Sequence, residues 1–87
     1  MRAIHKTTGD ELEVITTYDE HRKMGLILEK MYGHFPDDVT IAWIDHTWEL
    51  AEKRIVETGL YEAVILEEGK VRGTMDVNLD EVEKVEI

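Results

Sequence analysis

The chain has 87 residues, a length typical of one domain, and a formal net charge of −10 from 20 acidic and 10 basic residues. It contains no cysteine and no serine, which excludes disulfides, thiolate chemistry and serine nucleophiles. A strongly acidic chain without a basic stripe is repelled by phosphate backbones, so no direct nucleic-acid binding is predicted.

Hydrophobic residues make up 43% and charged residues 34% of the chain, which indicates one globular domain over residues 1–87. No apolar run approaches the roughly 20 residues needed to span a bilayer, and no apolar signal segment is visible at the start. We therefore expect a cytoplasmic protein with no membrane contact. The absence of glutamine and cysteine beside many glutamates and lysines favours a thermophilic source.

The first elements are two alternating segments, 2–7 and 11–17, on either side of the turn residues Gly9 and Asp10. In the second segment Leu12 and Val14 alternate with acidic residues, as in a strand with one buried face. The pattern predicts a β-hairpin at the N-terminus.

A helix is predicted over Tyr18–Tyr32, where apolar residues recur at helical spacing. Thr17 and Glu20 have the spacing of a capping box, in which the Thr17 hydroxyl accepts from the Glu20 amide and the Glu20 carboxylate accepts from the Thr17 amide. Gly33 is expected to end the helix in a left-handed conformation. Gly25, inside the helix, is expected to allow close packing.

The segment 39–58 has two interpretations. Its first six residues are rich in β-branched and aromatic side chains, which favours a strand followed by a helix from His46 to Thr58, capped by Asp45 and ended by Gly59. The same segment also carries apolar residues on two opposite helical stripes, which would fit one helix over 38–58.

The C-terminal third predicts a second hairpin, with strands over Leu60–Glu67 and Lys70–Val77 and a turn at Gly69. Residues 83–87 could add an acidic edge strand. Strands at both ends with helices between them predict an α+β fold. Its antiparallel sheet would pack on two helices in the order β-β-α-β-α-β-β, with an optional last strand.

The sequence "IDHTWE", residues 44–49, places three ionisable side chains close together. The structural interpretation makes Asp45 a helix cap and both tryptophans packing residues. The alternative is a metal-dependent or acid–base enzyme, because His46 and Glu49 are spaced i, i+3 and His34 could provide a third ligand.

The leading hypothesis is a protein-interaction module without catalytic activity or cofactor, which binds a partner protein or a second copy of itself. Its expected surface contains Leu50 and Trp43, because Leu50 would lie opposite the main apolar stripe of the helix. A third hypothesis, based on charge alone, is an acidic regulator that occupies a basic protein surface.

Overall fold

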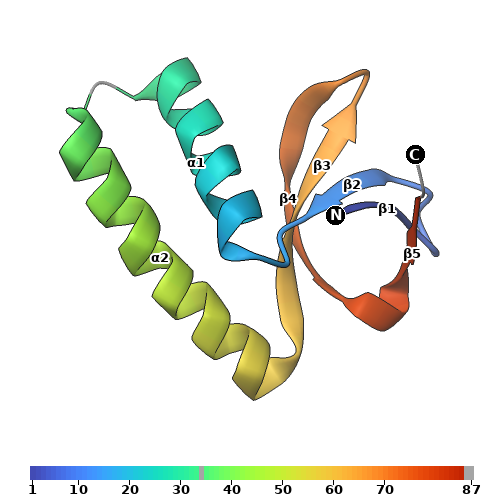
Figure 1. Ribbon diagram of the computed structural model, residues 1–87. Coiled ribbons are helices and arrows are strands. Elements are labelled where there is room, and N and C mark those ends of the chain that lie inside the picture. Colours follow the sequence, from blue (N-terminus) through green and yellow to red (C-terminus); the bar gives the residue numbers. More distant parts are fainter. Residues whose placement is uncertain (34, 86–87) are drawn as a thin grey trace.

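The computed structural model describes residues 1–33 and 35–85, and over these residues it confirms the predicted α+β fold (Figure 1). Its helices and strands, in chain order, are β1 (Arg2–His5), β2 (Glu11–Val14), α1 (Tyr18–Tyr32), α2 (Asp37–Thr58), β3 (Leu60–Glu67), β4 (Lys70–Asn78), the 3₁₀ helix η1 (Leu79–Glu81) and β5 (Val82–Lys84). Neither of the two α-helices found in these residues is long and apolar enough to cross a membrane.

The strands form an antiparallel sheet in the order β4-β3-β2-β1-β5, so β4 and β5 lie at opposite edges although only η1 separates them in the chain. Four strand spacings in a flat sheet amount to about 19 Å. The three residues of η1 rise only about 6 Å. The sheet therefore has to curl until its two edges approach each other, and the curl is visible in Figure 1.

The core lies on the inner face of this curled sheet. Cross-strand partners share a face, and the pairs Ala3–Leu12, Val14–Ala63 and Tyr61–Val77 all point to this side. The core cluster of buried residues is Ala3, Leu12, Val14, Ala63, Val77 and Val82. The sheet thus buries its own apolar side chains without help from the helices.

The helices form an antiparallel hairpin that connects β2 to β3 and lies against the outer face of β3 and β4 (Figure 1). Gly25 of α1 faces Ile44 of α2, and a Cβ at position 25 would lie 2.8 Å from Ile44 Cγ1. This confirms the prediction that Gly25 allows close packing. Ile44 and Thr40 are the buried residues of α2 within the described part of the chain.

The strand expected at the start of segment 39–58 is not formed, since α2 runs without interruption over Asp37–Thr58. The single-helix interpretation is therefore correct, and Asp45 lies inside the helix instead of capping it. Ile44 explains why the segment is helical. Its side chain is 0% exposed and packs against Gly25 of α1, and only a helix places it on the same apolar stripe as the other residues that face α1. Pro36 precedes α2 and provides no side-chain cap.

Both predicted hairpins are present. The first is shorter than expected, because β1 and β2 end at His5 and Val14. In the second, β3 has the predicted bounds and β4 extends one residue further, to Asn78, with a register shift between Ile65 and Leu66. The last strand is Val82–Lys84 at the edge of the sheet, and positions 86–87 lie outside the described residues.

Candidate functional site

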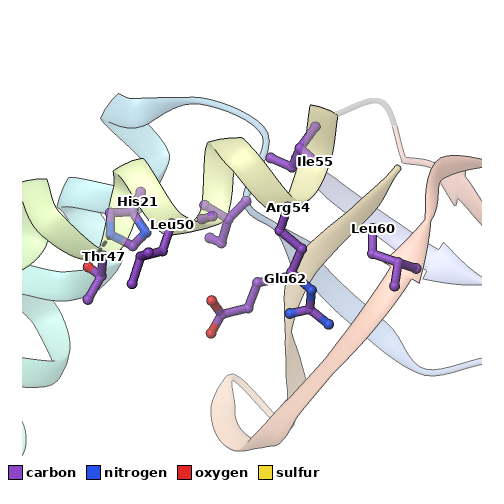
Figure 2. A pocket seen from close by; sticks show the side chains of 9 residues that line it. His21, Thr47, Leu50, Arg54, Ile55, Leu60 and Glu62 are labelled. Atoms are coloured by element: carbon purple, nitrogen blue, oxygen red, sulfur yellow. Dashed lines mark hydrogen bonds between the residues drawn. The ribbon is translucent and has the colours of Figure 1, made fainter. Parts of the chain in front are cut away.

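A cavity of about 210 Å³ opens where α2 converges on the start of β3 (Figure 2). Leu50, Arg54 and Ile55 reach it from α2, Leu60 and Glu62 from β3. His21 of α1 and Ile15, which follows β2, also line it. Most of these side chains are apolar, so the cavity is suited to bury carbon surface with a few charged groups around it.

A second cavity, of about 220 Å³, lies further along the hairpin and is lined by Met24 and Leu28 of α1, Trp43 of α2, and Val64 and Val71 of the sheet. The two cavities share the lining residues Ile15, His21, Thr47 and Glu62. They therefore adjoin, and together we call them the hairpin groove. One of its walls is α2 and the other is the outer face of β3 and β4.

Polar contacts fix both helices around the groove. The Nε2 atom of His21 lies 3.1 Å from the carbonyl oxygen of Ile44 and 2.9 Å from Thr47 Oγ1. A carbonyl oxygen only accepts, so Nε2 carries the proton in this contact. His21 thereby links α1 to α2, and its ring also lies 5.5 Å from that of Trp48, centroid to centroid.

Arg54 ties the C-terminal half of α2 to the sheet. Its guanidinium donates to the carboxylate of Asp76, and this hydrogen bond and charge raise the pKa of Arg54, with a smaller contribution from Glu62. Glu62 and Asp76 are cross-strand partners on β3 and β4, so the positive charge of Arg54 offsets the repulsion between these two carboxylates. Arg54 of α2 and Glu62 of β3 both line the first cavity (Figure 2).

The two tryptophans have different environments. Trp48 is half-buried against α1, where its ring meets that of Tyr18 edge-on with centroids 6.3 Å apart. Trp43 is 57% exposed, and so is Leu50, one i, i+7 interval further along α2. The expectation that both tryptophans are packing residues is therefore wrong for Trp43, because the stripe that carries it faces the groove and solvent.

The remaining residues of "IDHTWE" do not converge. Asp45 accepts a hydrogen bond from the Tyr18 hydroxyl, which raises the pKa of Tyr18. His46 and Glu49 are both exposed on α2. Within residues 1–33 and 35–85, no group of three or more histidine or acidic side chains is placed to hold a metal ion. His34 lies outside the described residues, so the structure does not test the three-ligand hypothesis.

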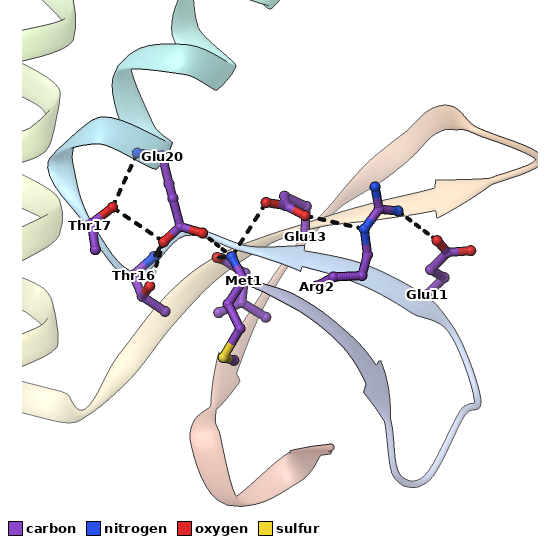
Figure 3. Close-up of polar contacts among 8 residues, drawn as sticks. Met1, Arg2, Glu11, Glu13, Thr16, Thr17 and Glu20 are labelled. Atoms are coloured by element: carbon purple, nitrogen blue, oxygen red, sulfur yellow. Dashed lines mark hydrogen bonds and ion pairs between the residues drawn. The ribbon is translucent and has the colours of Figure 1, made fainter. Parts of the chain in front are cut away.

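The predicted N-terminal cap of α1 is present, with a different partner for Glu20. Thr17 Oγ1 accepts from the Glu20 amide at 3.2 Å, as expected. The Glu20 carboxylate does not return to the Thr17 amide; it accepts from the amide of Thr16 at 3.0 Å and from the N-terminal ammonium of Met1 (Figure 3). The contact with Met1 ties the start of α1 to the residue that precedes β1.

This arrangement lowers the pKa of Glu20. Partial burial raises its pKa, but hydrogen bonds from the Met1 ammonium and from Thr16 outweigh that effect and bring the pKa to about 2. The ammonium also donates to Glu13 Oε1 at 3.3 Å and to the carbonyl oxygen of Val14 at 2.7 Å. A charged carboxylate is thus part of the folded structure at neutral pH.

The two glycine caps differ. Gly59 ends α2, as predicted. Its φ of +72° is left-handed, and its amide donates to the carbonyl of Ile55 at 2.9 Å. Gly33 also follows the last residue of its helix and donates to Glu29, but its φ is −94° and its ψ 164°. The left-handed conformation predicted for Gly33 is therefore wrong, because the chain leaves α1 in an extended conformation toward Phe35.

Sequence reasoning identified two residues of the groove, Trp43 and Leu50, because they lie on the second apolar stripe of α2. It did not find the opposite wall, which consists of β3 and β4, nor the Arg54–Asp76 contact that holds the walls in place. No local pattern signals these residues, since they meet only through the tertiary fold. Comparisons with protein-family models, with curated proteins and with solved structures find no match to this chain.

Proposed function

We propose that this protein is an interaction module without catalytic activity, and that it binds another protein through the hairpin groove and its exposed α2 rim. The observation that carries the proposal is the position of Trp43 and Leu50. Both are large, apolar and 57% exposed, and both line the groove. Large apolar side chains left in water beside a concave apolar surface are typical of binding sites.

The distribution of exposed apolar residues supports the same conclusion. Among the described residues, eight of the ten large exposed hydrophobic side chains belong to the helical hairpin and its connecting loop. They are Leu26, Ile27, Met31, Phe35, Val39, Trp43, Leu50 and Val56. The curled sheet has its own core, so this surface is not needed to hold the sheet together. A partner that covered the part of this surface beside the groove, which includes Trp43 and Leu50, would remove apolar area from water, at roughly 25 cal/mol per Å².

Two ionisable groups that line the groove, His21 and Arg54, are held in contacts between elements. The Nε2 atom of His21 is engaged by Ile44 and Thr47, and the guanidinium of Arg54 is engaged by Asp76. These contacts hold elements together. A general acid or base would need a proton-transfer atom free to reach a substrate.

The test is a selection of peptides from a displayed random library, with the purified protein as bait. The Trp43→Ala, Leu50→Ala double variant is the groove-deficient bait. Val56→Ala is the matched control, because Val56 is 81% exposed on the same helix, about 120° around it from Leu50, and lines neither cavity. We expect peptides that bind the wild type and Val56→Ala and fail to bind the double variant. Selected peptides that bind the double variant as well as they bind the wild type, or a selection that enriches no peptide, would contradict the proposal.

A further inference from the structure

We infer that the occupant of the hairpin groove is an amphipathic helix with a basic polar face, contributed by a different protein. The inference rests on the proposed function and adds the chemistry of the partner. It depends on three features of the described residues: the exposed apolar residues on the α2 wall, the β3 and β4 residues that line the same cavities, and the carboxylates placed along the groove.

The shape of the groove fits a helix. Trp43 and Leu50 are seven residues apart on α2, which places them about 10.5 Å apart along the helix axis on nearly the same side. Side chains at this spacing interlock with those of a helix packed alongside, as ridges fit into grooves. On the other wall, Val64 and Val71 of the sheet face the same space. A third helix would extend the layer that α1 and α2 already form on the outer face of β3 and β4.

The charges along the groove are predominantly negative. Glu62 lines both cavities, at the middle of the groove. Glu29 lies beside Trp43 around a small hollow at one end of the groove. Arg54 is the one lysine or arginine among the residues that line the two cavities, and Asp76 already pairs with it.

A partner with lysine or arginine beside its apolar anchors would therefore gain favourable contacts with Glu62 at the middle of the groove and with Glu29 at one end. The rest of the chain acts in the same direction, since its net charge is −10. A long-range field of this sign speeds the approach of a basic partner and slows the approach of an acidic one.

The same charges disfavour a second copy as the occupant. Two copies would each contribute a net charge of −10 and the same groove carboxylates. Their repulsion is long-ranged at low salt and weakens as the Debye length falls from about 10 Å at 0.1 M to about 3 Å at 1 M salt. Self-association would thus strengthen with added salt, whereas binding of a basic helix would weaken. The sign of the salt dependence separates the two occupants.

The experiment uses two labelled peptides of about 18 residues, long enough to cover about 27 Å as a helix. Both carry leucine at i, i+4, i+7 and i+11; one has lysine and the other glutamate at the flanking positions. Fluorescence anisotropy is measured with the full chain at about 0.1 M and about 1 M NaCl, and sedimentation of the protein alone is recorded in both buffers.

We expect the lysine peptide to bind at least about tenfold more tightly than the glutamate peptide at low salt, and to lose this advantage at high salt. Trp43→Ala should weaken binding of the lysine peptide. Glu29→Gln with Glu62→Gln should weaken it more than Asp80→Asn with Glu83→Gln, the control pair, which removes the same charge from the exposed η1 and β5. Circular dichroism of each variant shows that it is folded.

Each other outcome has a distinct meaning. Equal binding of both peptides, sensitive to Trp43→Ala, would overturn the inferred charge of the partner and leave the proposed function standing. A dimer that strengthens with salt and is lost in Trp43→Ala would identify a second copy as the occupant and overturn the inference. If neither peptide binds and the protein stays monomeric in both buffers, both the inference and the interaction groove are wrong.

Discussion

Gly25→Ala is expected to destabilise the protein, although alanine is the better helix former. At an exposed helix position the change would stabilise by about 1 kcal/mol. Here the added Cβ would lie 2.8 Å from Ile44 Cγ1 and 2.9 Å from Ile44 Cδ1, both closer than normal carbon contacts. Ile44 is fully buried, so its side chain would have to shift within the packed helix interface to accept the new Cβ. Overpacking of this kind costs about 1–3 kcal/mol.

Together, the two effects should lower the free energy of unfolding by about 1 kcal/mol. For a domain of this size, that corresponds to a melting temperature lower by roughly 4–8 °C. Urea unfolding followed by circular dichroism measures it. Ile44→Val provides the matched test, because it removes the Cδ1 methyl that the new Cβ would contact. In the double variant Gly25→Ala should cost less than in the wild type. If Gly25→Ala in the wild-type background instead raised the free energy of unfolding by about 1 kcal/mol, the close approach of α1 and α2 would be refuted.

Three further predictions concern stability. Thr17→Ala should lower the free energy of unfolding by about 1 kcal/mol, because it removes the hydroxyl that accepts from the Glu20 amide; an unchanged denaturant midpoint would contradict this cap. The pKa of Glu20 is lowered from 4.5 to about 2, so its charged form stabilises the protein above pH 4.5 and this stabilisation is lost as the pH falls toward 2. The midpoint difference between wild type and Glu20→Gln should therefore be constant near neutral pH and shrink below pH 4.5, and a difference that stays the same at low pH would refute the contact with Met1. Trp48→Ala should cost roughly 2–4 kcal/mol, because Trp48 packs on Tyr18, and Trp43→Ala less than about 1 kcal/mol, because Trp43 is 57% exposed; equal costs in urea titrations would show that Trp43 is packed.

Local patterns predicted much of the fold. The hairpins around Gly9 and Gly69 follow from short alternating segments with turn residues between them, and both glycines have positive φ values, +77° in each case. The Thr17 cap follows from a three-residue spacing. Each of these features depends on residues that are close in the chain, which is why the sequence alone was sufficient.

Segment 39–58 shows where local patterns fail. Its β-branched residues favour a strand, but Ile44 packs on Gly25 of α1, and this contact makes one long helix the better solution. The choice between strand and helix therefore depends on Gly25, which lies 19 positions before Ile44 in the chain. The groove was harder still to predict, since the contact of Arg54 with Asp76 joins residues 22 positions apart. Asp76 carries no sequence signal of that role.

The central claim is that partners bind in the hairpin groove, and backbone amide chemical-shift mapping tests it most directly. The ¹⁵N-labelled protein is titrated with the lysine peptide. Binding in the groove predicts shifts concentrated at Trp43, Leu50 and Val64, which belong to both walls of the groove, and little change in β1 and β5 on the far side of the sheet. Shifts that centre on β1 and β5, or saturating binding that leaves the amides of Trp43 and Leu50 unmoved, would contradict it.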